Sequence, residues 1–255
     1  MTSYAPGTPS WVDLGTPDVD GAAAFYAGLL GWDVQDGAPE TGGYRMCQLR
    51  GRAAAGLGPQ QSPDMPPFWT CYVTVADADA TTARARDLGG AVLVEPMDVM
   101  TFGRMAVLAD PAGAAFSIWQ AGDHIGCEVV NEPGAFCWSE LLTTDVEGSA
   151  AFYGGLFGWE ARTAEGDMPY TELHLDGRGI AGMMPKPPGM PAEAPPMWMV
   201  YFAVADVDAA TARVPELGGA VLMPIMDSPA GRFATVADPA GAAFYLIDLA
   251  AGLGG

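Results

Sequence analysis

The stretch AFYAGLLGW at residues 24–32 returns as AFYGGLFGW at residues 151–159. An alternating run that ends in aspartate precedes each copy, WVDLGTPD from residue 11 and WSELLTTD from residue 138. Aspartate suits a helix N-cap because its carboxylate accepts hydrogen bonds from free amides of the first turn, and the glycine before each tryptophan suits the helix end. Both copies therefore predict a strand, a helix and a second strand.

Two further segments extend this repeat. LGGAVL at 88–93 returns at 217–222, and ADPAGAAF at 109–116 returns at 237–244. Proline presets φ and glycine accepts positive φ, so each Asp-Pro-Ala-Gly predicts a hairpin turn, whereas the proline-rich segments 60–67 and 185–196 are expected to be linkers. The sequence predicts an α+β fold of four β-α-β-β-β units, two in a first domain at 9–121 and two in a second at 135–250, joined by a linker at 122–134.

Composition limits the possible partners. The 255 residues carry 11 basic and 31 acidic side chains, a formal net charge of −20, which repels nucleic acid and anionic membranes. No apolar run is long enough to span a bilayer and no signal peptide precedes the first strand, so we expect a cytoplasmic protein. The four cysteines, Cys47, Cys71, Cys127 and Cys137, lack Cys-x-x-Cys spacing and are expected to be reduced core thiols.

Four such units, with Phe-Tyr-x-x-Leu-x-Gly-Trp closing the first helix and Asp-Pro-x-Gly before each last strand, resemble the vicinal oxygen chelate superfamily. That superfamily includes glyoxalases, extradiol dioxygenases and bleomycin-resistance proteins, and the two-domain form is most similar to a glyoxalase-like or hydroxylase-like group. The resemblance implies that paired units curl mixed sheets into half-barrels around cavities. Relatives exchange units between domains, so the strand of Trp11 could face that of Tyr245 or that of Ser117.

Metal-using relatives place a histidine or glutamine on a unit's first strand and a carboxylate on a later strand. The matching first-strand positions here hold Trp11, Trp138, Thr70 and Met199, and the later-strand positions hold Ser117, Tyr245, Gly56 and Gly182. None of these is a usual ligand of a divalent ion. His124 is expected in the linker and His174 on a strand. The resemblance therefore implies a protein that has lost the metal, and we expect no cofactor.

Alternation along a strand places Trp11 and Asp13 on one face, with Trp138 and Glu140 as their counterparts, and the resemblance turns that face toward the cavity. A carboxylate beside an indole in an apolar groove favours a cationic or donor-bearing ligand. The structural alternative is that Asp13 and Glu140 pair with Arg104 or Arg232 and only stiffen the fold. Further candidates for the cavity wall are Trp69, Trp198, Tyr72, Tyr201, Trp119, Tyr245, Met97, Met183, Met184, Met199 and Met226, and Arg104 and Arg232 are also candidates for ligand contact.

Three functions remain open. The first is a metal-independent protein that binds a hydrophobic aromatic small molecule, with or without a cationic group, such as an antibiotic or another natural product. The second is a metal-free enzyme that tailors a natural product, with Asp13 or Glu140 as general base and Tyr72, Tyr201 or Tyr245 as donor. The third, a metal-dependent lyase or dioxygenase, requires ligands that the sequence does not show. The expected partner is a small molecule, and the expected state is a monomer with an internal pseudo-dimer.

Overall fold

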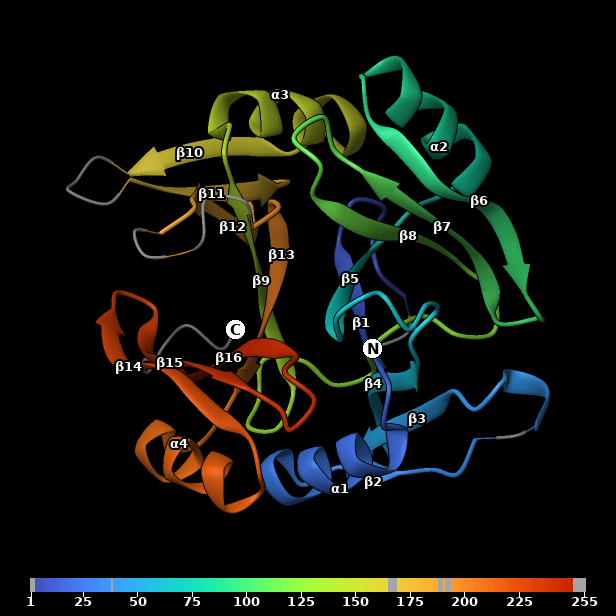
Figure 1. The fold of residues 1–255 in the computed structure, drawn as a ribbon. Helices are drawn as coiled ribbons and strands as arrows, with labels where there is room; N and C mark the ends of the chain where they lie inside the picture. Colours follow the sequence, from blue (N-terminus) through green and yellow to red (C-terminus); the bar gives the residue numbers. More distant parts are fainter. Residues whose placement is uncertain (1–2, 38, 165–168, 188–189, 191–193, 250–255) are drawn as a thin grey trace. The chain divides into compact units, whose positions relative to one another are not determined.

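The computed structural model describes residues 3–37, 39–164, 169–187, 190 and 194–249 (Figure 1). Residues 188–189 and 191–193 of the expected linker, and residue 250 at the expected end of the second domain, lie outside this part. The fold is α+β, as predicted, and each quarter of the chain follows the strand-helix-strand order read from the repeat. No helix of the described part is long and apolar enough to cross a membrane.

The first half of the chain holds two repeats. The first repeat contains β1 (Pro9–Thr16), α1 (Val19–Leu30), β2 (Asp33–Val34), a 3-10 helix (Pro39–Thr41), β3 (Arg45–Leu49) and β4 (Arg52–Pro59). The second repeat contains β5 (Phe68–Thr74), α2 (Ala78–Asp87), β6 (Ala91–Val99), β7 (Gly103–Ala109) and β8 (Ala115–Ala121).

The second half follows the same order. The third repeat contains β9 (Phe136–Thr143), α3 (Val146–Phe157), β10 (Glu160–Ala164), β11 (Tyr170–Leu175) and β12 (Arg178–Pro185). The fourth contains β13 (Met197–Ala203), α4 (Val207–Glu216), β14 (Ala220–Ser228), β15 (Gly231–Ala237) and β16 (Ala243–Leu249).

Aspartate caps begin all four helices. The Asp18 carboxylate accepts a hydrogen bond from the Gly21 amide at 2.9 Å, and Asp145 does the same for α3. Asp77 caps α2, and Asp206 caps α4. Gly31, which ends α1, adopts φ 74°, a left-handed conformation that costs glycine little. Local sequence therefore fixes where the helices begin and end.

The chain folds into two compact units that do not follow the two halves of the sequence. Unit 1 contains Met1–Ser10, Cys71–Ile125 and Ser139–Met199, so it joins the second and third repeats. Unit 2 contains Trp11–Thr70, Gly126–Trp138 and Val200–Gly255, so it joins the first and fourth. The expected domain bounds, 9–121 and 135–250, therefore differ from these units, because packing pairs repeats across the two halves of the chain. The strand of Trp11 shares a unit with that of Tyr245.

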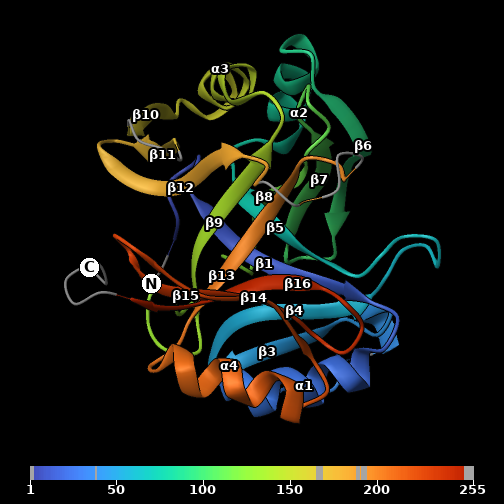
Figure 2. The same ribbon diagram turned by 60° about the vertical axis from the view of Figure 1, so that its left-hand side comes forward.

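Each unit combines parallel and antiparallel strand pairs. In unit 2, β1 pairs in parallel with β4, which continues to β3 and β2, while β13 pairs in parallel with β16, which continues to β15 and β14. In unit 1, β9 with β12 and β5 with β8 form the corresponding parallel pairs. The helices lie in pairs, α2 beside α3 in unit 1 and α1 beside α4 in unit 2 (Figure 2).

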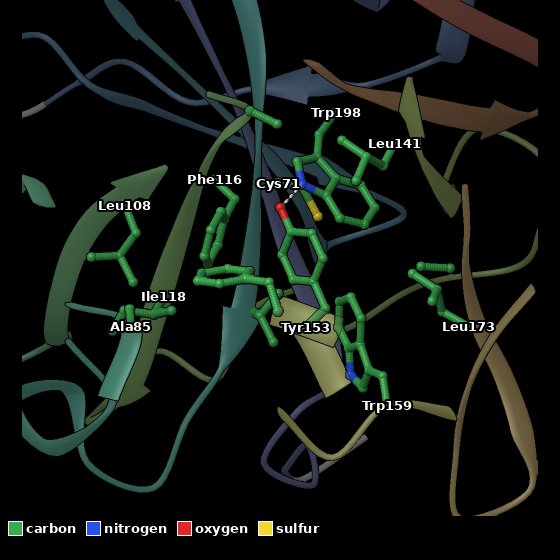
Figure 3. Close-up of a cluster of buried hydrophobic side chains, with 14 of the residues drawn as sticks. Cys71, Ala85, Leu108, Phe116, Ile118, Leu141, Tyr153, Trp159, Leu173 and Trp198 are labelled. Atoms are coloured by element: carbon green, nitrogen blue, oxygen red, sulfur yellow. Dashed lines mark hydrogen bonds between the residues drawn. The ribbon is translucent and has the colours of Figure 1, made fainter. Parts of the chain in front are cut away.

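A hydrophobic core lies between the sheet strands and the helices of unit 1 (Figure 3). Leu141 of β9 and Leu173 of β11 are buried there together with Tyr153 of α3. Side chains alternate along a strand, so the neighbours of Leu141, including Glu140, point to the opposite side of the sheet. In each unit we call the side of the strands that faces away from the helices the helix-free face, and the candidate site lies on the helix-free face of unit 2.

Candidate functional site

On the helix-free face of unit 2, three side chains, two aromatic and one acidic, are linked by successive hydrogen bonds. The indole Nε1 of Trp11 donates a hydrogen bond to the Tyr44 hydroxyl at 3.0 Å. That hydroxyl in turn donates to Oδ2 of Asp13 at 3.3 Å. Trp11 is buried, whereas Asp13 and Tyr44 are half-buried. The expected tryptophan-carboxylate pair is therefore joined by a tyrosine that sequence reasoning missed.

Glycines make room for this tyrosine. In the register of β1 and β4, Asp13 lies opposite Gly56, and Gly15 lies opposite Gly58. A Cβ atom on Gly56 would overlap the Tyr44 hydroxyl, and one on Gly58 would lie 3.0 Å from Cδ2 of the ring. The Tyr44 side chain consequently lies directly on the backbone of β4.

The residues at the family's ligand positions do not fit a metal ion. Gly56, which stands where a carboxylate would be needed, has no side chain, and the Tyr44 hydroxyl fills the space that one would require. The first-strand position holds the Trp11 indole, whose ring nitrogen is a donor only. In unit 1, Gly182 lies opposite Glu140 in the same register. No group of three or more histidine, cysteine, aspartate or glutamate side chains among the described residues could hold a metal.

The fourth repeat adds aromatic rings to the same unit. Tyr201 of β13 pairs with Tyr245 of β16, and their rings stack with centroids 4.2 Å apart. Phe233 of β15 lies 5.8 Å from Tyr245 and 6.2 Å from Tyr201. Thr235, opposite Tyr245 in register, has a buried hydroxyl without a hydrogen-bond partner among the described residues.

The helix-free face of unit 1 is built from the same positions with different residues. Tyr72 pairs with Ser117, and its ring contacts that of Trp119 edge-on at 6.4 Å. The Trp119 indole donates to the carbonyl oxygen of His124 at 2.8 Å. Glu140 is only 4% exposed. Trp138, the expected companion of Glu140, is half-buried and belongs to unit 2, because the boundary between the units falls directly after it.

Two of the expected wall residues lie elsewhere. Trp69 donates a hydrogen bond to the Tyr26 hydroxyl at 3.0 Å, and Trp198 donates to the Tyr153 hydroxyl at 2.9 Å (Figure 3). Tyr26 and Tyr153 are helix residues, so both indoles belong to the cores under the helices and not to the helix-free faces. The expectation failed because it counted aromatic residues on the first strands without separating the two faces of each strand.

The methionine candidates and His174 also lie in different parts of the structure. Met199 of β13 is buried, and alternation places it on the face opposite Trp198. Met183 lies in the hydrophobic core with Trp198, and Met97 on β6 is exposed. Nε2 of His174 lies 2.9 Å from Oε2 of Glu172, a contact typical of a strand histidine with a structural role.

The two arginines form ion pairs on the surface. Arg104 binds Asp79 through Nε at 2.7 Å and Asp98 through Nη1 at 2.9 Å, and its guanidinium group lowers the pKa of Asp79. Arg232 binds Asp208 in the same way and lowers the pKa of that carboxyl group. Both arginines therefore form ion pairs with aspartates near the start of a helix, and neither belongs to the candidate site.

The cysteines are free thiols. Cys47, Cys71 and Cys127 are buried and Cys137 is half-buried, and burial raises the pKa of the Cys71 thiol to about 12. A thiol that remains protonated is a poor nucleophile, so these side chains act as small core residues.

An open depression at the surface of unit 1 is lined by residues 6–7, 75–77, 80–81 and 156–157, away from the helix-free face.

Comparison with known proteins defines the class. The model of the glyoxalase/bleomycin resistance protein/dioxygenase superfamily matches residues 123–246, and that of a glyoxalase-like domain matches residues 11–119. The chain belongs to this superfamily.

Individual relatives cover nearly the whole chain. It is 40% identical to the anthracycline biosynthesis protein DauV of Streptomyces sp. (strain C5), over 98% of this chain and 96% of the relative. It is also 40% identical to the anthracycline biosynthesis protein DnrV of Streptomyces peucetius, over 99% and 97%. The fold resembles the Mn(II)-bound glyoxalase from Novosphingobium aromaticivorans with a TM-score of 0.68 at 15% identity, over 96% of this chain and 84% of that one.

Proposed function

We propose that this protein binds an aromatic small molecule of natural-product biosynthesis, through the helix-free face of unit 2 and without a metal ion. The observation that carries the proposal is the hydrogen-bonded series Trp11, Tyr44 and Asp13. It places an indole donor and a carboxylate acceptor on one face, where a ring with a polar substituent can be held by both. The names of the two Streptomyces relatives support a natural product as the ligand class.

The aromatic rings of the fourth repeat support the same proposal. Tyr201, Phe233 and Tyr245 present flat apolar surfaces, and stacking on such rings contributes about 0.5–1.5 kcal/mol beyond area burial. Aromatic side chains have few rotamers, so they lose little entropy when a ligand contacts them. The net charge of −20 adds an attraction for ligands that carry an amine.

A metal-free enzyme that tailors a natural product is the second candidate. The hydrogen bond from Tyr44 to Asp13 favours it, because a carboxylate next to a phenol can accept a proton while the phenol donates one. In that case Asp13 would be the general base in unit 2, and Glu140 its counterpart in unit 1.

Calorimetric titration with a series of planar aromatic compounds tests the proposal. We expect saturable binding in the presence of a chelator, with weaker binding by Trp11→Ala. Mass spectrometry of the recovered ligand separates the two candidates, since a binding protein returns it unchanged and an enzyme converts it. If no compound of the series binds to the wild type or to any variant, the proposal is wrong.

A further inference from the structure

Tyr44 occupies its position in the way that a bound ligand would. Its ring lies on the glycines of β4, and its hydroxyl is held between the Trp11 indole at 3.0 Å and the Asp13 carboxylate at 3.3 Å. The side chain comes from the residue directly before the short strand β3 and is half-buried. A phenol ring of the chain itself thus shows which group this surface accommodates, namely one flat ring with one hydroxyl.

We infer that the ligand of this protein carries a phenolic ring, and that this ring takes the place of Tyr44 on the glycines of unit 2. The inference rests on the proposed function. A ligand phenol can accept from Trp11 Nε1 and donate to Asp13, as Tyr44 does, so the exchange preserves both hydrogen bonds. A methoxy group in the same position can accept but cannot donate, and it leaves the Asp13 carboxylate without this partner.

The two units differ in the space that they offer. In unit 2 the register pairs Gly15 with Gly58, and nothing but the Cα atom of Gln60 lies within 4 Å of a Cβ built on Gly15. The corresponding pair in unit 1 is Leu142 with Met184. Two large side chains therefore stand where unit 2 has bare backbone, so a flat ring has room on unit 2 and not on unit 1.

Unused hydrogen-bonding groups in unit 2 support this assignment. Gln60 is two residues beyond Gly58, so the two-residue alternation places it on the same face as Gly56 and Gly58. Its side-chain oxygen is buried without a hydrogen-bond partner in the described part of the chain. The buried Thr235 hydroxyl is in the same situation. A buried polar group without a partner costs about 1–3 kcal/mol, and a ligand with further polar substituents can remove that cost. Ser117 in unit 1 has such a hydroxyl as well, but its side chain is fully buried.

The test compares 2-naphthol with its methyl ether, 2-methoxynaphthalene, by calorimetric titration of the wild type and of Tyr44→Ala. Removing Tyr44 removes a competitor for the site, which raises the fraction of protein ready to bind. We expect 2-naphthol to bind Tyr44→Ala about tenfold more tightly than the wild type, and the methyl ether to gain less. Tyr170→Ala, the same change at the matching position of unit 1, should leave both affinities unchanged.

Two further variants keep the test decisive. Tyr44→Phe retains the ring but loses both hydrogen bonds, so 2-naphthol should also bind it more tightly than the wild type, and this variant replaces Tyr44→Ala if the latter fails to fold. Trp11→Phe removes the donor and should weaken 2-naphthol binding. Weaker binding of 2-naphthol by both Tyr44 variants, or an equal change with Tyr170→Ala, would overturn the inference but leave the proposed function standing. Binding of neither compound to any variant would overturn both.

Discussion

The hydroxyl of Tyr153 lies 3.3 Å from Oδ2 of Asp110, and Tyr26 repeats this contact with Asp238 at 3.2 Å in the other unit. Each tyrosine is fully buried and also accepts a hydrogen bond from a tryptophan. Each aspartate begins an Asp-Pro-Ala-Gly turn, and its other oxygen accepts from the backbone, from Ala114 in the case of Asp110. A helix, a turn and a first strand are thereby tied together in both units.

Tyr153→Phe should destabilise the fold. The change removes one oxygen and leaves the Trp198 indole and the Asp110 carboxyl group without this partner inside the core, at a cost of about 1–3 kcal/mol. Urea unfolding measures the loss. Ligand affinity should stay unchanged, because these residues lie under the helices, and Tyr26→Phe should behave alike in unit 2. A variant as stable as the wild type would show that the contact contributes nothing.

Asp110→Asn should change how stability depends on pH. Burial raises the pKa of Asp110 above its ordinary value of 3.8, so the folded protein holds this proton more tightly than the unfolded chain. The resulting stabilisation is complete below pH 3.8 and is lost as the pH rises through the raised pKa. Asparagine can still accept from Ala114 but does not titrate, so the variant should gain stability relative to the wild type as the pH rises.

Urea unfolding at several pH values from 4 to 7 checks this expectation. Asp123→Asn, a change at an exposed position, serves as the control and should follow the wild type throughout. Parallel curves for Asp110→Asn and the wild type would mean that the pKa of Asp110 is not raised.

Gly56→Ala should disturb unit 2 through Tyr44 alone. The added methyl group overlaps the Tyr44 hydroxyl, and overpacking of this kind costs about 1–3 kcal/mol. In a Tyr44→Ala background the obstacle is absent, so the same change should cost much less. A double-mutant cycle of unfolding free energies measures the coupling. Additive effects would show that the two residues do not contact each other.

Asp13→Asn should weaken a cationic aromatic ligand more than a neutral one of the same shape. The change keeps the size of the side chain but removes the charge that attracts the cation. Titration with matched cationic and neutral naphthalene derivatives measures the difference, with Glu140→Gln as the control in unit 1. Equal losses for both ligands would assign Asp13 to the scaffold and leave the preference of the site purely apolar.

Purified protein should contain no stoichiometric divalent metal. The expectation rests on Trp11, Gly56 and their counterparts at the ligand positions, since these groups offer no usual ligand atoms. Plasma mass spectrometry measures the metal content, and titration after dialysis against a chelator measures its effect on binding. About one zinc, iron, nickel or manganese ion per site, lost together with ligand affinity, would refute the expectation.

The sequence predicts the repeats, caps and turns well, because these depend on short-range chemistry such as the Asp18 carboxylate and the glycine at residue 31. It does not predict which repeats pack together, because the first and third repeats share the Phe-Tyr motif and the second and fourth share the Asp-Pro-Ala-Gly turn, so each repeat has two candidate partners. The same limit explains the errors at the candidate site. Trp69 and Trp198 were expected on the wall, yet they are held by tyrosines of the helices.

The sequence does not predict Tyr44 as a residue of the site, for a related reason. Its role depends on Gly56 and Gly58 in a neighbouring strand, and only the register of β3 and β4 brings them together. One pattern in the sequence could have revealed it, since the first and third repeats both carry a tyrosine at the corresponding position, Tyr44 just before β3 and Tyr170 at the start of β11. Comparing the repeats position by position would have drawn attention to that pair.

The pairing of the first repeat with the fourth has a consequence for synthesis on the ribosome. Residues 11–70 leave the exit tunnel long before residues 200–249, with which they share a compact unit. At roughly 5–20 residues per second, the nascent first repeat waits several seconds with its apolar face uncovered. Unit 1 ends at Met199, so all of its residues emerge before those that complete unit 2. During synthesis the first repeat therefore stays without its packing partner longer than the second repeat does.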